Sequence, residues 1–255
     1  MFSFLKDHPF AVEAFFESSL VLTFAIQKQD AEQLVPECLE VDSFNENWAF
    51  LAVAMVQTKN LRPKGFPGFS GSSFFLVGYR IFVRFKTRSG KILRGLYILK
   101  SETDKKRMEI LGNMFTHYNY STTDIWQTGA DGIKEIGSEK SGLKLRFNIG
   151  RGENIALPVD SPFANWQEAQ KFAGPLPFTF TYRPGSDRVL IIEGVRKNWK
   201  PRPVQVMDYY FSFIDNLKLN EVRLANAFII QNVPYYWKKG RIEPWMKNEE
   251  NFRAS

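Results

Sequence analysis

Two strand-like runs separated by a two-residue turn most strongly constrain how this chain can fold. Residues 74–88 and 91–100 are rich in β-branched and aromatic side chains, and Ser89-Gly90 lies between them. A two-residue connection with glycine is typical of a tight β-hairpin, because glycine readily adopts the positive φ that such turns need. The sequence therefore predicts antiparallel β-structure in this part of the chain.

The position of the turn also predicts which side chains share a face of the hairpin. With Ser89-Gly90 at the turn, Arg80, Phe82 and Tyr97 lie on one face and Lys100 lies on the other. Side chains alternate between the two faces of a strand, so a shift of one residue would exchange the faces. The predicted faces therefore depend on the predicted turn.

Strand-like runs also dominate the rest of the sequence. Helical patterns are limited to residues 30–36 and 103–115. Roughly eight or nine strands with few helices predict a mainly β fold of the barrel or sandwich type. We expect one domain over residues 1–255, because no linker or repeat divides the chain. The further strands are expected at 18–26, 47–57, 143–149, 178–182, 188–195, 205–213 and 224–232.

The cysteine and histidine content excludes several classes of protein. Cys38 is the only cysteine, so no internal disulfide can form, and His8 and His117 are the only histidines. This set cannot supply the ligands of a usual Cys/His zinc site, and we predict neither a metal nor a cofactor. The sequence shows no apolar stretch of membrane-spanning length and no signal-peptide pattern, so we expect a cytoplasmic protein.

Charge is distributed unevenly along a chain whose formal net charge is +7. Residues 59–107 contain thirteen basic side chains and two acidic ones, whereas residues 1–58 contain nine acidic side chains and two basic ones. The basic segment can attract an anionic partner such as a nucleic acid, or it can pair with the acidic segment. We favour internal pairing and expect no nucleic-acid partner, because the sequence has no nucleic-acid-binding motif.

The sequence lacks the common catalytic motifs, which leaves single residues as candidates. It has no nucleophile elbow, no phosphate-binding loop and no dinucleotide-binding glycine motif. His117 follows a predicted helix and could act as a general base near neutral pH, although packing among its aromatic neighbours is the simpler interpretation. Lys100 could act as an amine if its strand position is buried, or it could reach solvent.

Arg80 is the most informative single residue. It lies in the middle of a predicted strand, between Gly78-Tyr79 and Ile81-Phe82. A guanidinium in such a position must be paired or must face a wet cavity. Its fork of donors suits a carboxylate or phosphate ligand. A salt bridge to the acidic N-terminal segment and a ligand-binding role both remain compatible with the sequence.

Several short motifs, taken in order, resemble a known family. They are Leu34-Val35-Pro36-Glu37, Trp48-Ala49-Phe50, Tyr79-Arg80-Ile81-Phe82-Val83, Gly95-Leu96-Tyr97 and Val195-Arg196-Lys197-Asn198-Trp199-Lys200-Pro201. Over most of the chain their order is similar to that of the uncharacterised DUF2071 (YqjF-like) family, whose members resemble acetoacetate decarboxylases. The resemblance implies an antiparallel, cone-shaped β-barrel with flanking helices and an enclosed ligand cavity. It also implies that Arg80 points toward that cavity.

Two departures from the family pattern bear on the activity. The family strand usually has glutamate and asparagine before its arginine, whereas this chain has Leu76-Val77-Gly78-Tyr79-Arg80. The lysine with which the decarboxylases form a Schiff base falls near Thr116-His117, where this chain has none. Lys105-Lys106 lies too early in the chain to replace it. These departures argue against decarboxylation through the family's imine.

Three functions are compatible with these observations. The favoured one is a barrel that binds a small anionic or amphiphilic molecule, for example a carboxylate, with Arg80 as the anchor and Phe82, Tyr97 and His117 as further contacts. The second is a lyase acting on a keto acid, with Lys100 as the amine and His117 as a proton shuttle. The third is an interaction protein that uses the basic segment, residues 59–107, to bind a nucleic acid or an anionic membrane. The ligand, any reaction and the oligomeric state stay open.

Overall fold

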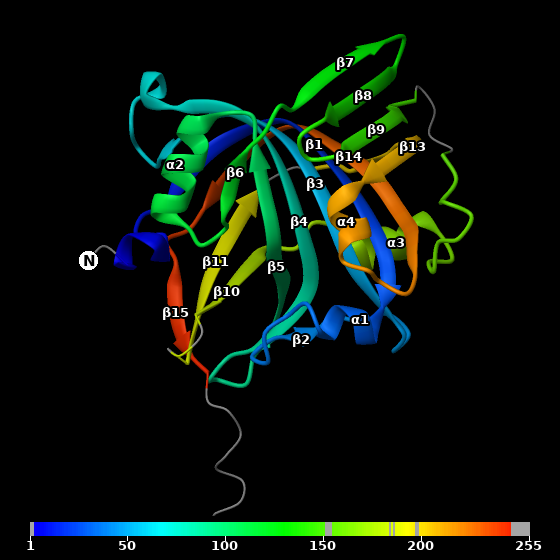
Figure 1. The fold of residues 1–255 in the computed structure, drawn as a ribbon. Helices are drawn as coiled ribbons and strands as arrows, with labels where there is room; N and C mark the ends of the chain where they lie inside the picture. The colour runs from blue at the N-terminus through cyan, green and yellow to red at the C-terminus, as the bar shows by residue number, and fades with distance from the viewer. Residues whose placement is uncertain (1–2, 151–154, 184, 186, 197–198, 246–255) are drawn as a thin grey trace, which may run out of the picture.

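A closed ring of seven strands forms the frame of the molecule in the computed structural model, which describes residues 3–150, 155–183, 185, 187–196 and 199–245 (Figure 1). The order around the ring is β14, β1, β3, β4, β5, β10 and β11, and β11 closes it by pairing with β14. All of these pairings are antiparallel except that of β5 with β10. The ring strands are β1 (Val12–Gln27), β3 (Trp48–Pro63), β4 (Ser72–Lys86), β5 (Ile92–Thr103), β10 (Phe178–Arg183), β11 (Arg188–Arg196) and β14 (Val222–Trp237).

A smaller sheet and several short elements surround the ring. The smaller sheet has the order β13, β9, β8, β7, and its strands are β7 (Trp126–Ala130), β8 (Ile133–Ser138), β9 (Leu143–Asn148) and β13 (Gln205–Phe211). The helices are η1 (Ser3–Asp7), α1 (Lys28–Glu32), η2 (Gly68–Ser70), α2 (Lys106–Phe115), α3 (Trp166–Ala173) and α4 (Ser212–Asn216). Short strands β2 (Glu40–Val41), β6 (Tyr120–Thr122), β12 (Arg202–Pro203) and β15 (Arg241–Pro244) complete the fold.

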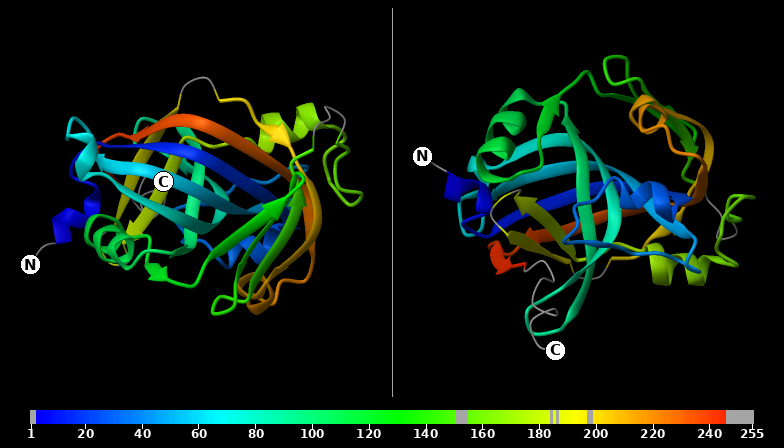
Figure 2. Two further views of the ribbon diagram at one scale, coloured as in Figure 1. Left: turned by 90° about the horizontal axis from the view of Figure 1, so that it is seen from above. Right: turned by 60° about the horizontal axis from the view of Figure 1, so that its bottom comes forward.

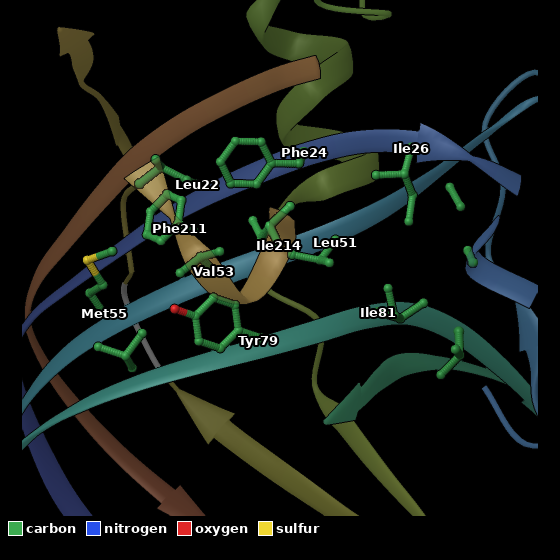
Figure 3. Packing of buried hydrophobic residues seen from close by; sticks show 14 of the residues in the cluster. Leu22, Phe24, Ile26, Leu51, Val53, Met55, Tyr79, Ile81, Phe211 and Ile214 are labelled. Carbon is green, nitrogen blue, oxygen red and sulfur yellow. The ribbon is translucent and has the colours of Figure 1, made fainter. Parts of the chain in front are cut away.

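The main hydrophobic core lies against the outer face of the ring. Leu22, Val53 and Tyr79 come from three neighbouring ring strands, and Phe211 and Ile214 of β13 and α4 pack over them (Figure 3). Burying an aliphatic or aromatic side chain of this size stabilises the folded chain by about 1.5–3 kcal/mol. Because strand side chains alternate between faces, the residues between these core positions point into the ring.

Two helices lie at opposite ends of the ring (Figure 2). At one end, α3 packs in an aromatic cluster in which the ring of Phe50 stacks on that of Phe163, with centroids 5.2 Å apart. Phe82 of β4 belongs to the same cluster. At the other end, α2 packs beside β6, with Met108 and Tyr120 in a small cluster of their own. Both ends are thus partly closed by helices.

The prediction of a mainly β fold with few helices is confirmed, and the central hairpin consists of β4 and β5. The predicted turn is too short, however. The strands end at Lys86 and begin again at Ile92, and the Thr87 amide donates to the carbonyl of Lys91 at 2.9 Å. Residues 197 and 198, which belong to one of the sequence motifs, lie outside the described residues.

The predicted register of the hairpin is correct on one side of a β-bulge and wrong on the other. Tyr79 pairs with Lys100 as expected, but the next residue, Arg80, pairs with Ile98. Leu99 is the extra residue in β5, and such a residue reverses the faces of all side chains beyond it. On the turn side of the bulge the three-residue connection, 88–90, sets the pairs, so Tyr97 pairs with Ile81 and lies on the face opposite Arg80, in contrast to the prediction.

Sequence reasoning overlooked the hairpin of β7 and β8 and the helix α3. The hairpin carried a usable signal, since Asp131-Gly132 connects its strands and both residues have positive φ, 52° and 83°. An Asp-Gly pair is a strong signal for a two-residue turn. The predicted strand 205–213 is also shorter than expected, because it ends at Phe211 and α4 follows.

Several basic side chains of residues 59–107 pair with the acidic N-terminal segment, as the charge pattern predicts. Lys59 pairs with Glu17, and Arg84 and Arg94 each place Nε 2.6 Å from a carboxylate oxygen of the fully buried Asp42. Internal pairing therefore accounts for part of the basic segment. Of the helices in the described part of the chain, none is long and apolar enough to cross a membrane.

Candidate ligand cavity inside the ring

A cavity of about 430 Å³ lies inside the ring. All seven ring strands contribute to its wall, together with residues of α2 and of the loop after β3. Its size and its mainly apolar wall are those of a small-molecule site, which typically adds a few polar groups to fix orientation. The polar side chains of the described cavity wall include Ser101, Tyr118, Tyr120, Thr179, Arg196 and Tyr235.

Arg80 of β4 reaches into this cavity from the ring wall. Its Nε is buried and has no hydrogen-bond partner, and no carboxylate among the described residues pairs with it. Burial lowers the pKa of its guanidinium, and the neighbouring phenols of Tyr120 and Tyr235 oppose that shift. An arginine nevertheless stays protonated in proteins. A full positive charge is therefore held in the cavity wall.

Gly78 leaves room for the Arg80 side chain. Both residues face the cavity side of β4, and a Cβ at Gly78 would lie 3.1 Å from both Nε and Nη2 of Arg80. That separation is tighter than an ordinary van der Waals contact. A larger residue at this position would push the guanidinium away from its present place.

Tyrosine hydroxyls lie near the charged group. Burial raises the pKa of Tyr120 to about 12 and also raises those of Tyr118 and Tyr235, while the Arg80 charge acts in the opposite direction on each. These phenols therefore remain neutral at physiological pH. A neutral phenol can donate a hydrogen bond to an anion, so the tyrosines are suitable secondary contacts for a ligand held by Arg80.

A second guanidinium, that of Arg196 at the end of β11, lines the same cavity. Its Nη1 donates to the Tyr235 hydroxyl at 3.3 Å, and its Nη2 donates to the Pro175 carbonyl. The group also lies over the rings of Trp199 and Tyr235, 5.6 and 5.7 Å from their centroids. Burial lowers the pKa of Arg196 as well. All of these contacts are with neutral groups.

The described wall of the cavity is positively charged and contains no aspartate or glutamate. Arg62 also lines it but has its own partner, since its Nη2 lies 2.7 Å from an oxygen of Glu13. Arg107 lines the cavity from the exposed side of α2. The electrostatics of the cavity therefore favour an anion over a neutral or cationic molecule.

The other residues predicted for the site are distributed over three places. Phe82 lines the cavity with Arg80, whereas Tyr97 and His117 line a second, more open pocket. The three-residue hairpin connection, which pairs Tyr97 with Ile81, explains the position of Tyr97. Lys100 lies on the opposite face of β5 from the cavity, where its Nζ is 2.8 Å from a carboxylate oxygen of Glu102.

His117 is held in a polar cluster near the surface. Its Nε2 lies 3.1 Å from Nη2 of Arg183 and 3.4 Å from a carboxylate oxygen of Asp7. Burial lowers the pKa of His117, the charges of Arg183 and Lys6 lower it further, and Asp7 opposes the shift. The structure therefore does not bring His117 together with Lys100 or Arg80. In the described residues no group of three or more His, Cys, Asp and Glu side chains is arranged to hold a metal ion.

Sequence reasoning identified Arg80 and Phe82 but missed the other polar groups of the cavity. Arg196, Tyr235 and Tyr120 come from β11, β14 and β6, which are distant in sequence from Arg80. Arg196 was part of a motif used for the family resemblance, yet nothing local indicated where its side chain points. Only the closure of the ring places these residues around one space.

A ring of strands closed around an internal cavity is the architecture of this chain, and the comparisons with known proteins place it in a family and a fold. The chain belongs to the DUF2071 family, described as an uncharacterized conserved protein, whose family model matches residues 14–233. No curated protein sequence matches the chain.

Solved structures with a similar fold include acetoacetate decarboxylase and related enzymes. Acetoacetate decarboxylase from Legionella pneumophila subsp. pneumophila str. Philadelphia 1 has a TM-score of 0.58 at 10% identity, over 92% of this chain and 87% of that one. An acetoacetate decarboxylase-like enzyme from Sphingomonas wittichii RW1 has a TM-score of 0.58 at 10% identity, over 95% and 96% of the two chains. The enduracididine biosynthesis enzyme MppR, complexed with pyruvate, has a TM-score of 0.53 at 12% identity, over 92% and 90%. At these identities the likeness is one of fold.

Proposed function

We propose that the chain binds a small organic anion, a carboxylate, in the cavity of the ring, with Arg80 as its anchor. The observation that carries this proposal is the buried Nε of Arg80, which has no hydrogen-bond partner among the described residues. Partial burial of a guanidinium without a charged partner is unfavourable, and a carboxylate that accepts two of its N–H groups would offset that cost. Proteins rarely hold such a group without use for it.

The rest of the cavity suits the carbon skeleton of such a ligand. Phe82, Leu96 and Ile98 line the space beside Arg80 and supply apolar contacts. Tyr118 and Tyr120 supply hydroxyl groups near the charge. The structure of MppR with pyruvate supports the proposal by analogy, since pyruvate is a small carboxylate and the two proteins share a fold. The second pocket, with Tyr97 and His117, is not part of the proposed site.

A lyase reaction on a keto acid is the second candidate, and the fold similarity to acetoacetate decarboxylase favours it. Against it, no lysine lines the described part of the cavity, and Lys100 pairs with Glu102 on the other face of β5. Reduction with borohydride in the presence of acetoacetate tests this candidate by mass spectrometry. A lysine-linked adduct would support the lyase, and an unchanged mass would count against an imine mechanism.

Thermal unfolding with matched acid and amide pairs tests the proposed binding function. We expect carboxylates such as phenylacetate, hexanoate or acetoacetate to raise the melting temperature of the wild type, and phenylacetamide to have no effect. Arg80→Met should reduce the affinity for the best carboxylate about tenfold or more, because a charge-assisted hydrogen bond is lost. Arg62→Met is the matched control, since Arg62 lines the same cavity but pairs with Glu13.

Two results would contradict the binding proposal. One is an equal melting shift in the wild type and in Arg80→Met. The other is a lack of any shift across the whole carboxylate panel in the wild type. A shift that persists in Arg62→Met but disappears in Arg80→Met supports the assignment of Arg80 as the anchor.

A further inference from the structure

Two partly buried guanidinium groups face the cavity without a carboxylate partner among the described residues, whereas Arg107, which also lines the cavity, is exposed to solvent on α2. Arg80 comes from β4 and Arg196 from β11, and both line the same space. Tyr235 of β14 lies within electrostatic reach of both groups, and its hydroxyl accepts a hydrogen bond from Arg196. Both charges therefore line one cavity of about 430 Å³, and both act on the same tyrosine.

The other arginines in comparable surroundings are paired, which makes the two cavity arginines exceptional. Arg62 at the same cavity pairs with Glu13 at 2.7 Å. Arg84 and Arg94 share the buried carboxylate of Asp42, each at 2.6 Å. For each of these three arginines the chain itself supplies a carboxylate partner. Arg80 and Arg196 lack such an acid on the described wall of the cavity.

Charge balance gives the number of negative charges that the cavity can accommodate. Two like charges held near each other in a low-dielectric interior repel, and each also costs desolvation energy. A ligand with one negative charge would compensate for one of them and leave the other unpaired. A ligand with two negative charges would compensate for both, and a guanidinium can bind each carboxylate through two N–H groups.

We propose that the cavity binds an organic dianion. Arg80 binds one negative charge of this ligand, Arg196 binds the other, and the Tyr235 hydroxyl lies between them. This inference rests on the proposed function and narrows its ligand class. The shared chemistry is a pair of negative charges on an apolar body, which either two carboxylates or one phosphate monoester can supply. The apolar wall formed by residues such as Phe82 and Ile98 would contact the body of the ligand.

Calorimetric titration of the full chain with matched ligands tests the inference. Phenylsuccinate and 3-phenylpropanoate share a skeleton and differ by one carboxylate, and phenyl phosphate represents the phosphate class. We expect phenylsuccinate or phenyl phosphate to bind the wild type at least about tenfold more tightly than 3-phenylpropanoate, as one further charge-assisted contact would give. The dianion with the higher affinity shows whether the cavity prefers two carboxylates or one phosphate monoester.

Variants of Arg196 separate the dianion from a monoanion. Arg196→Met should lower the affinity for the preferred dianion about tenfold and leave that for 3-phenylpropanoate within about twofold. Arg196→Lys, which keeps the charge and is less disruptive, should retain part of the preference. Arg146→Met, which removes an arginine of β9 that does not line the cavity, should leave it unchanged. For phenyl phosphate, affinity should rise from pH 5 to 7, as the phosphate monoester loses its second proton near pH 6.

The possible failures distinguish this inference from the proposed function. If mono- and dianions bind the wild type equally and both are lost in Arg80→Met, Arg80 remains the anchor of a carboxylate site and the dianion inference is wrong. An equal loss of both ligands in Arg196→Met and Arg196→Lys would also overturn it. If none of the three ligands and no carboxylate of the panel binds the wild type, both proposals fail together.

Discussion

Arg80 shows how a charged side chain can be accommodated inside a β ring. Its strand neighbour Gly78 leaves space for the guanidinium, and nearby tyrosines surround it with polar but neutral groups. None of these groups carries the compensating negative charge. In the absence of an anion, the residue is therefore expected to reduce the stability of the fold, which is typical of residues retained for binding rather than packing.

We expect Arg80→Met to stabilise the ligand-free protein. Replacing a partly buried charge that has no counter-charge by an apolar residue of similar length removes a desolvation cost, so we expect a gain of about 1 kcal/mol. Arg94→Met should have the opposite effect, because it removes one of the two partners of the buried Asp42. Urea unfolding in a buffer without carboxylate or phosphate measures both changes. A loss of stability in Arg80→Met as large as that in Arg94→Met would indicate that Arg80 is structural.

Stability should fall as the pH is lowered through 6.5, partly because of His8. Burial is the main cause that lowers the pKa of His8 below its ordinary value of 6.5. The unfolded chain then binds a proton at a higher pH than the folded chain does. His8 therefore makes its full contribution to the free energy of unfolding above pH 6.5. This contribution is lost as the pH falls from 6.5 toward the folded-state pKa of His8.

His8→Asn isolates this contribution, since asparagine tolerates the positive φ of 53° at this position. We expect the melting temperature of this variant to fall less between pH 7.5 and pH 5.5 than that of the wild type. The comparison needs only thermal scans in buffers of equal ionic strength. Parallel curves for the two proteins would show that His8 does not contribute.

At the level of single elements, the bulge in β5 determines the composition of the cavity. Because Leu99 is the extra residue, Ile98 faces the cavity beside Arg80 and Tyr97 faces away. Lys100, on the other side of the bulge, pairs with Glu102 outside the cavity. One residue in one strand therefore separates the anchor of the proposed site from the amine that a lyase would need.

The helix α3 depends on a reciprocal cap at its first turn. The side chain of Asn165 accepts from the Glu168 amide at 2.9 Å, and the Glu168 carboxylate accepts from the Ala164 amide at 2.7 Å. We expect Asn165→Ala to destabilise the protein by about 1 kcal/mol. Asn165→Asp should stay close to the wild type because aspartate also caps helices. Equal stabilities of all three proteins in urea would contradict a stabilising cap.

At the scale of the whole molecule, the fold depends on closing the ring through the parallel pairing of β5 with β10. Gly95 makes this close approach possible, because a Cβ there would lie 2.5 Å from the Phe178 carbonyl oxygen and from the Phe180 ring. Such a contact cannot form without moving one strand. The cavity exists only while the ring is closed, so this glycine supports the site from a distance.

Gly95→Ala should therefore destabilise the protein by about 1–3 kcal/mol, the usual cost of overpacking. We also expect weaker carboxylate binding, since the wall formed by β5 and β10 would shift. Gly68→Ala serves as the control, because the added Cβ would meet its nearest atom at an ordinary 3.6 Å. Chemical denaturation and ligand titration measure the two effects. A Gly95→Ala protein with wild-type stability would show that the strands can separate without cost.

The sequence by itself determined the mainly β class and most of the strands, and it singled out Arg80 as the candidate anchor. These conclusions follow from local rules, since strand alternation and a charge in an apolar strand can be recognised within a few residues. Even the overlooked hairpin had a local signal in Asp131-Gly132. The same local rules indicated that the acidic and basic segments would pair, as they partly do.

The tertiary structure alone decided which residues surround Arg80. Arg196 and Tyr235 reach the cavity because β11 pairs with β14 and closes the ring, a contact between strands that no short pattern specifies. Tyr97 was assigned to the wrong face because the hairpin connection has three residues, 88–90, where two were predicted, and the bulge at Leu99 restores the predicted register only beyond Tyr97. Side-chain direction follows from the local backbone, but proximity follows from non-local pairing, and the proposed site depends on proximity.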